Sequence, residues 1–158
     1  MKTNLKQKPK IPISQEFKSA LGLSKVKDDE NVLATYAFDS SPIPFRKPNL
    51  VVMAENKEDV KESLRIANHH KIPVAVMSGG VNVAGMAVPL EGGIVLDLRR
   101  MDNIIDINTD SGYAVIEPGV IFDKFTVALA DKGFRCHIPT SPGGSTVCLL
   151  YTSDAADE

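Results

Sequence analysis

Cysteine, net charge and long apolar runs are all scarce in this sequence, and each scarcity excludes a class of protein. Two cysteines, Cys136 and Cys148, are too few for a disulfide framework or a four-ligand zinc site. The 18 lysines and arginines against 20 aspartates and glutamates give a net charge of -2, so we expect no nucleic-acid partner, because phosphate binding needs a concentrated cationic face. No apolar run approaches the roughly 20 residues that span a bilayer, so we expect no transmembrane segment.

What is present is the composition of a globular domain. The chain has 158 residues, of which 43% are hydrophobic and 24% are charged, enough for one domain with a core. Residues 1–13 carry several lysines and two prolines without the apolar stretch of a secretory signal, so they predict a flexible basic arm. Ordered structure is expected from Ser14, which would cap a helix over 14–21. A second helix is predicted over 30–38.

From Leu50 onward the pattern alternates between strand and helix, which indicates an α/β or α+β fold with short strands. A strand over 50–53, a helix capped by Asn56 and a strand over 74–77 form a βαβ unit, which favours parallel pairing. The other predicted elements are strands over 94–98, 103–107 and 113–116, the last two antiparallel, and a helix with Phe122, Phe125 and Leu129 on one face that ends at Gly133.

The most informative stretch is the glycine-containing loop 76–89, which leaves a predicted strand and has no charged residue. Gly79 and Gly80 permit a sharp turn that points several backbone N–H groups one way, which suits a pyrophosphate. Ser78 and Asn82 could add side-chain donors. Taken alone, two adjacent glycines are more often a plain tight turn between strands.

Two common nucleotide-binding loops are excluded, and two further loops support the first. No Gly-Lys-Ser/Thr triplet of a P-loop occurs, and Gly79, Gly80 and Gly85 lack the spacing of the dinucleotide fingerprint. The turn 117–120 and the Gly/Ser/Thr-rich loop 139–147 could offer backbone donors to the same ligand. Each alone is more often structural, but three such loops in one domain favour a shared ligand.

The motifs, in this order, resemble the FAD-linked oxidase family with the vanillyl-alcohol oxidase and p-cresol methylhydroxylase (PCMH) fold. The sequences AVPLEGGIVLDLRRM at 87–101, EPGV at 117–120 and YAFDSSP at 36–42 are similar to its glycolate oxidase and D-lactate dehydrogenase branch. The resemblance implies a PCMH-type FAD-binding domain of two α/β subdomains with FAD between them. Residues 14–147 would form a part of it, truncated in the second subdomain, with a substrate domain farther along the chain.

The same resemblance implies which residues bind FAD. The branch has Arg-Gly-Gly-Gly-Thr where this chain has MSGGV at 77–81, which is instead similar to the berberine-bridge-type branch. There a histidine after the two glycines is tethered to the flavin, and Val81 in that place cannot form the bond, so we expect noncovalent FAD. The predicted cofactor-binding residues are Ser78, Gly79, Gly80, Val81, Asn82, Val83, Gly85, Pro118, Gly119, Pro139, Thr140, Ser141, Gly143, Gly144, Ser145 and Thr146.

The activity that the resemblance implies is oxidation of a 2-hydroxy acid, of the D-lactate or glycolate class, by hydride transfer to flavin. It also implies two further kinds of partner, an electron acceptor and other subunits. The expected location is cytoplasmic or peripheral to the inner membrane. Alternatives are a berberine-bridge-type oxidase of alcohols or sugars, and a flavin-binding subunit that only transfers electrons. No catalytic residue is assigned: Asp97 and Glu117 lie at predicted strand ends, where capping and turn hydrogen bonds are favoured over acid–base work.

Two pairs of residues invite a metal interpretation that the patterns do not favour. His69 and His70 are adjacent on a predicted helix, so they point about 100° apart and do not share one ion easily. Cys136 and His137 have no further candidate ligands nearby, which favours loop packing. No metal site is expected.

The last 11 residues, CLLYTSDAADE at 148–158, do not continue the family pattern. They resemble the in-frame translation of a transposon-end adapter used to prepare sequencing libraries. We expect them to be non-native, with an ordinary polar tail as the alternative, and a DNA read across the junction from an independent source distinguishes the two.

Overall fold

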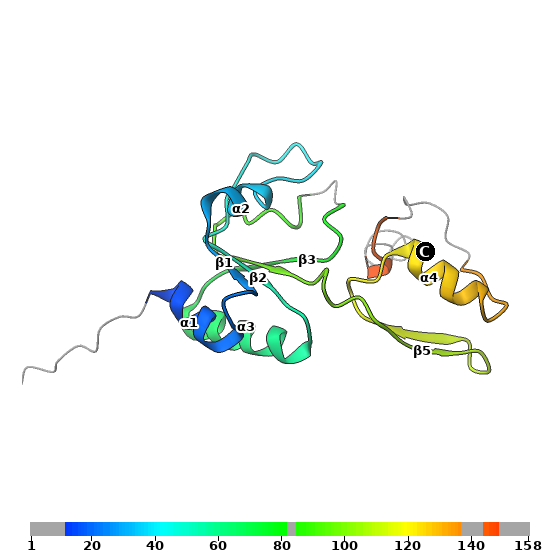
Figure 1. Ribbon diagram of the computed structural model, residues 1–158. Helices are drawn as coiled ribbons and strands as arrows, with labels where there is room; N and C mark the ends of the chain where they lie inside the picture. Colours follow the sequence, from blue (N-terminus) through cyan, green and yellow to red (C-terminus); the bar gives the residue numbers. More distant parts are fainter. Residues whose placement is uncertain (1–11, 82–84, 137–143, 149–158) are drawn as a thin grey trace, which may run out of the picture.

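The computed structural model describes residues 12–81, 85–136 and 144–148. Most of the predicted basic arm and all but the first residue of the predicted adapter-derived tail therefore lie outside the described residues. The described chain forms two lobes, the first built around a four-stranded sheet and the second around a two-stranded hairpin (Figure 1). The first lobe contains α1 (Ile13–Leu21), β1 (Val26–Lys27), α2 (Glu30–Thr35), β2 (Leu50–Met53), α3 (Lys57–His70), β3 (Val74–Met77) and β4 (Ile94–Asp97).

The sheet of the first lobe has the strand order β1-β2-β4-β3. Strands β2 and β3 both pair with β4 in parallel, with Val51 and Ala75 on either side of Val95. The parallel direction predicted for the βαβ unit is confirmed, but β4 lies between its two strands, so β2 and β3 are not neighbours. At one edge the two-residue strand β1, too short to predict from its pattern, pairs antiparallel with β2.

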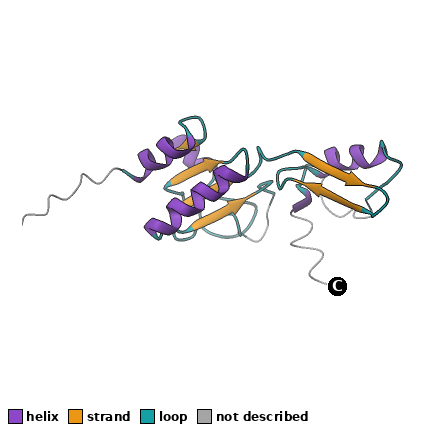
Figure 2. Ribbon diagram, turned by 90° about the horizontal axis from the view of Figure 1, so that it is seen from below, coloured by secondary structure: helices purple, strands orange, loops and turns teal. Residues whose placement is uncertain are grey.

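Both faces of this sheet are covered by helices, which explains the unbroken apolar runs of its strands (Figure 2). Alternate side chains point to opposite faces. Leu50 and Leu96 pack in the cluster that includes residues of α1 and α3, whereas Val51 and Val95 pack against α2 on the other face. These four strand residues are almost completely buried.

Local capping defines where the helices start. The Asn56 side chain accepts hydrogen bonds from the backbone N–H groups of Glu58 and Asp59, both at 3.0 Å, as predicted. The cap predicted at Ser14 is wrong, because α1 begins one residue earlier and Pro12 occupies the N-cap without a side-chain cap bond. The helix predicted over 30–38 ends at Thr35.

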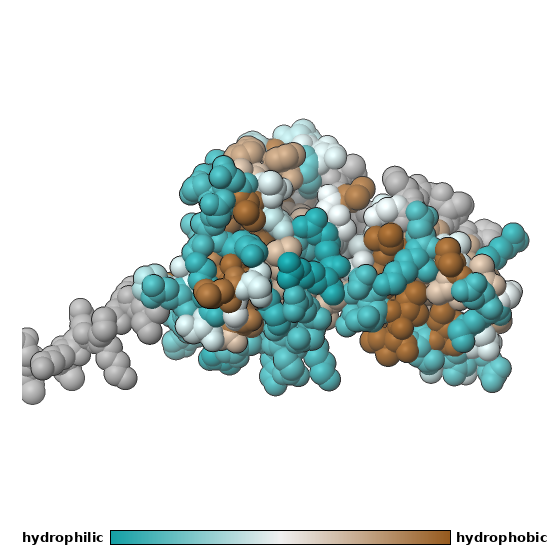
Figure 3. Space-filling model, in the orientation of Figure 1, coloured by the Kyte–Doolittle hydropathy of each residue, from teal (hydrophilic) through white to brown (hydrophobic). Residues whose placement is uncertain are grey.

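The second lobe consists of β5 (Ile104–Asn108), β6 (Tyr113–Ile116) and α4 (Phe122–Ala130). The two strands are antiparallel, as predicted, with a register shift between Ile104 and Asp106. Apolar side chains gather on the surface of this lobe (Figure 3), among them Ile105 and Val115, which are 64% and 43% exposed. Among the described residues, no helix combines the length and apolar character needed to cross a membrane.

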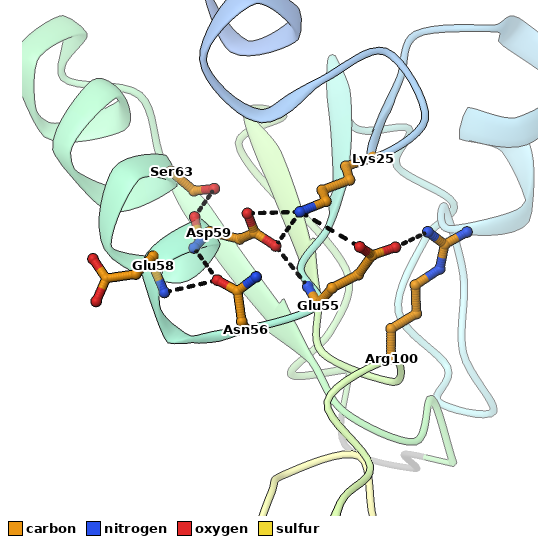
Figure 4. A network of polar contacts seen from close by, with 7 residues as sticks. All are labelled: Lys25, Glu55, Asn56, Glu58, Asp59, Ser63 and Arg100. Atoms are coloured by element: carbon orange, nitrogen blue, oxygen red, sulfur yellow. Dashed lines mark hydrogen bonds and ion pairs between the residues drawn. The ribbon is translucent and has the colours of Figure 1, made fainter.

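A network of charged side chains links the start of α3 to residues that flank β1, β2 and β4 (Figure 4). Lys25 Nζ donates to both carboxylate oxygens of Asp59, at 2.9 and 2.8 Å, and Asp59 Oδ2 also accepts the backbone N–H of Glu55 at 2.9 Å. Arg100 donates to Glu55 Oε1 at 2.7 Å. The hydrogen bond to Asp59 raises the pKa of Lys25 above its ordinary value. The network therefore ties the residues after β2 and β4 to one another.

Candidate functional site

The candidate site lies at the carboxyl ends of the parallel strands, where ligands of open α/β sheets usually bind. The predicted loop Ser78–Gly80 directly follows β3, and the segment from Leu98 to Met101 directly follows β4. The backbone N–H of Leu98 donates to Met77 O at 2.8 Å, so the two strand ends lie side by side. Residues from the second lobe approach both segments.

The first close approach joins the glycine loop to Ser145 and Thr146. Ser78 Oγ and Thr146 Oγ1 are 3.1 Å apart and form a hydrogen bond. A Cβ atom on Gly79 would lie 3.2 Å from Thr146 Cγ2 and 3.3 Å from both Thr146 N and Oγ1. Glycine at 79 therefore lets two loops that are far apart in sequence pack with their backbones almost in contact.

The second close approach is made by the turn that contains Gly119. A Cβ atom there would lie 2.6 Å from Leu98 O, 2.7 Å from Arg99 O and 2.8 Å from Met101 O, distances at which the backbone would have to move. The Gly119 N–H donates to Met101 O at 2.7 Å. Only glycine lets this turn rest on the chain that leaves β4.

Backbone hydrogen bonds complete the arrangement by joining the second and third predicted loops. The N–H of Val147 donates to Val120 O at 3.0 Å, and the N–H of Phe122 donates to Ser145 O at 2.8 Å. The structure thus brings Ser78, Gly79, Pro118, Gly119, Ser145 and Thr146 into one neighbourhood, as the sequence interpretation requires.

The residues of this neighbourhood fit a phosphate-containing cofactor. Ser145 is completely buried, and its Oγ has no hydrogen-bond partner among the described residues. Buried hydroxyls are nearly always paired, so an orphaned one is the kind of group that a polar ligand satisfies. Gly80, at the tip of the first loop, is exposed and has a positive φ of 74°, a backbone conformation in which N–H groups can turn toward an anion such as a pyrophosphate.

Other predicted cofactor-binding residues do not make these close contacts, or they cannot be placed. Gly85 packs closely against Ile43, which lies on the loop after α2, so its contact is with that loop and not with the three converging segments. Gly80, Val81 and Gly144 are exposed. The residues Asn82, Val83, Pro139, Thr140, Ser141 and Gly143 lie outside the described residues, and their assignment stays a prediction.

A buried polar cluster beside the site was not predicted from the sequence. The Asp97 side chain is fully buried at the end of β4 and accepts hydrogen bonds from Tyr36 Oη at 2.8 Å and from the Arg99 guanidinium, the shortest at 2.7 Å. Asp97 Oδ1 also accepts the Arg99 N–H at 2.9 Å, which is the predicted turn hydrogen bond. Burial, together with Asp97, raises the pKa of Tyr36 to about 12. Tyr36 and Asp97 each belong to a motif quoted for the family, but nothing local indicates that they meet.

The remaining candidates behave as structural residues. Glu117 accepts hydrogen bonds from the backbone N–H and the side-chain amide of Asn103, both at 2.8 Å, as predicted for a turn. His70 contacts Glu16 of α1 at 2.8 Å. In the part of the chain that the structure describes, no three histidine, cysteine, aspartate or glutamate side chains cluster as metal ligands.

A cavity of about 530 Å³ opens next to the site, between β6 and α4. Its lining is mostly apolar and includes Ala114, Ile116, Phe122 and Phe125. Pro118 lines this cavity and directly precedes Gly119 of the candidate site, so the cavity and the site are adjacent at this turn.

Three parallel strands, β2, β4 and β3, whose carboxyl ends carry glycine-containing loops are typical of α/β proteins that bind nucleotide cofactors. Residues 48–148 match the FAD binding domain family, which is most of the chain, and the protein belongs to this family. The family resemblance inferred from the motifs is confirmed, as are FAD as the cofactor and the PCMH-type fold.

Known relatives agree with this assignment. The glycolate oxidase subunit GlcD of Bacillus subtilis (strain 168) is 31% identical over 124 residues, which is 78% of this chain and 26% of that protein. A D-lactate dehydrogenase from Archaeoglobus fulgidus is 34% identical over 134 residues, 80% of this chain and 29% of that protein. The crystal structure of p-cresol methylhydroxylase with substrate bound has a TM-score of 0.69 at 32% identity, over 77% of this chain and 24% of that chain. The chain therefore spans only about a quarter of the length of the relatives it matches.

Proposed function

We propose that this chain is the FAD-binding part of a flavin-dependent oxidoreductase that oxidises a 2-hydroxy acid of the D-lactate or glycolate class. The observation that carries the FAD site is the convergence of three Gly/Ser/Thr-containing segments, around Gly79, Gly119 and Thr146, at the carboxyl ends of β3 and β4. The substrate class rests on the similarity to glycolate oxidase subunit GlcD and to a D-lactate dehydrogenase.

In this proposal the chain supplies binding and orientation, and bound FAD supplies hydride-accepting chemistry. Ser78 and Thr146 hold the first and third loops together, while backbone N–H groups of the glycine loop face the pyrophosphate. The cofactor is held noncovalently, because Val81 stands where a tethering side chain would be needed. The residues that bind substrate and accept its proton are proposed to lie in the part of the parent protein outside this chain. The electron acceptor and further subunits are proposed as partners of the parent protein.

A second candidate substrate class is a para-alkylphenol. The similarity to p-cresol methylhydroxylase, at 32% identity, favours it. The FAD-binding part proposed here is common to both classes, so a choice between them requires the parent protein.

The FAD site is tested by titrating the chain with FAD and following the quenching of flavin fluorescence. We expect Gly80→Val to abolish saturable binding, because its side chain would project from the exposed glycine loop. Gly22→Val is the control away from the loop: both glycines have positive φ values, 74° and 96°, so a side chain strains the backbone at either position, but only Gly80 belongs to the candidate site. Unchanged affinity in Gly80→Val would contradict the loop assignment.

The substrate class is tested on the parent protein by anaerobic mixing with candidate substrates. Bleaching of the flavin absorbance by D-lactate or glycolate, and not by p-cresol, is the expected result. Bleaching by p-cresol alone would replace the hydroxy-acid proposal with the phenol one and leave the FAD site unaffected.

A further inference from the structure

The polar cluster of Tyr36, Asp97 and Arg99 connects two segments of the chain that are 61 positions apart. Tyr36 directly follows α2, Asp97 ends β4, and Arg99 lies in the connection from β4 to the second lobe. Asp97 is completely buried, whereas the Arg99 side chain is 48% exposed. A buried carboxylate requires charged or hydrogen-bonding partners, and Asp97 has both.

Arg99 is held in one orientation by several contacts. Its Nε lies 3.1 Å from both Asp97 carboxylate oxygens, and its terminal nitrogen donates to Asp97 Oδ2 at 2.7 Å and to Tyr36 Oη at 2.9 Å. The guanidinium carbon also lies 5.6 Å from the centre of the Tyr36 ring. A planar guanidinium that makes several such contacts is fixed in direction, which a lysine could not reproduce.

This fixed side chain belongs to the turn on which Gly119 rests. The backbone carbonyls of Leu98, Arg99 and Met101 are the atoms closest to a Cβ at position 119, and Met101 O accepts the Gly119 N–H. The Met101 N–H in turn donates to Leu98 O at 3.0 Å. Movement of Arg99 would therefore displace the surface that holds the second of the three cofactor loops.

We infer that Tyr36 and Asp97 are positioning residues for the FAD site, acting through Arg99 on the turn from Leu98 to Met101. The inference rests on the proposed FAD-binding function and adds residues that do not touch the three converging loops themselves. Arg65 on α3 serves as a comparison, because its guanidinium also pairs with a carboxylate, that of Glu62, but its side chain is 61% exposed and lies on a different element from the Leu98–Met101 turn.

The test compares Tyr36→Phe and Arg99→Ala with the control Arg65→Ala in the 158-residue chain, by FAD titration and by urea unfolding without FAD. We expect the FAD dissociation constant of the folded protein to rise about tenfold in Tyr36→Phe and more in Arg99→Ala, since a hydrogen bond to a charged group is lost. Arg65→Ala should change it less than about twofold. A lower urea midpoint with unchanged FAD affinity in both test variants would mean a merely structural cluster and overturn the inference.

Amide hydrogen exchange separates this inference from the proposed function. We expect Tyr36→Phe to increase exchange at Met101, Gly119 and Val120 while exchange within α3 stays unchanged. If the unsubstituted 158-residue chain binds no FAD, the proposed function fails. The hydrogen-exchange comparison alone then tests the link from Tyr36 to the Gly119 turn. Equal exchange at these three amides in both proteins would overturn it.

Discussion

At the scale of single residues, the first lobe contains two carboxylates that are almost completely shielded from water, one on β4 and one on α3. Asp97 is fully buried and Asp59 is 8% exposed. Each is compensated by a cation, Arg99 for Asp97 and Lys25 for Asp59. Removing one partner of such a pair costs more than the pair itself contributes, because the other charge stays buried.

Lys25→Met is therefore expected to lower the free energy of unfolding at neutral pH by about 1–2 kcal/mol, because Asp59 loses two hydrogen bonds to an ammonium group. The folded pKa of Lys25 is raised above 10.5, so its stabilisation is complete below that pH and is lost as the pH rises through the folded pKa. Urea unfolding at pH 7 and above pH 11 measures both effects. Lys61→Met, at a side chain that is 79% exposed, is the control and should leave the urea midpoint unchanged.

At the scale of elements, the loops that follow the strands depend on positions where no side chain fits. The Gly119 turn rests on three backbone carbonyls of the connection after β4, and the loop of Gly79 rests on Thr146. Local composition indicated that these loops are glycine-rich. It did not indicate which glycines are required by neighbours and which, such as Gly144, have no described residue within 4 Å of a Cβ position.

Gly119→Ala is expected to destabilise the chain by about 1–3 kcal/mol, since its Cβ would overlap backbone oxygens that flexible side chains cannot clear. Thermal unfolding followed by circular dichroism measures the loss. Gly144→Ala is the matched control, because no described residue lies within 4 Å of a Cβ at that position. Equal midpoints for the two variants would show that the turn can move away from β4 without cost.

At the scale of the whole molecule, the two lobes meet where the candidate cofactor site lies. The contacts described between them at this place are the Ser78–Thr146 hydrogen bond and the close approaches at Gly79 and Gly119, and the second lobe exposes apolar side chains such as Ile105. A ligand that contacts both lobes would stabilise the folded state only through its affinity for that state.

FAD at about one hundred times its dissociation constant is expected to raise the free energy of unfolding by about 2.7 kcal/mol. The measurement is urea unfolding with and without FAD. NAD, which shares the ADP half of FAD, is the control and should give a much smaller shift at the same concentration. Equal stabilisation by both would point to an ADP site without flavin selectivity.

The sequence by itself determined most of the elements and the family, but not β1 or the start of α1. Apolar runs marked β2, β3 and β4, Asn56 marked the start of α3, and the ordered motifs around Gly79, Gly119 and Thr146 indicated an FAD-binding domain. These signals are local, because the spacing of apolar residues, the helix caps and the glycine content are properties of a few consecutive residues.

Only the tertiary structure decided how these elements meet. It placed β4 between β2 and β3, joined Ser78 to Thr146 and brought Tyr36 to Asp97, residues that are 68 and 61 positions apart. Such pairings depend on which faces pack together and which buried charge needs a partner. No short pattern encodes them, since the same tyrosine or aspartate in another fold would find a different neighbour or remain in water.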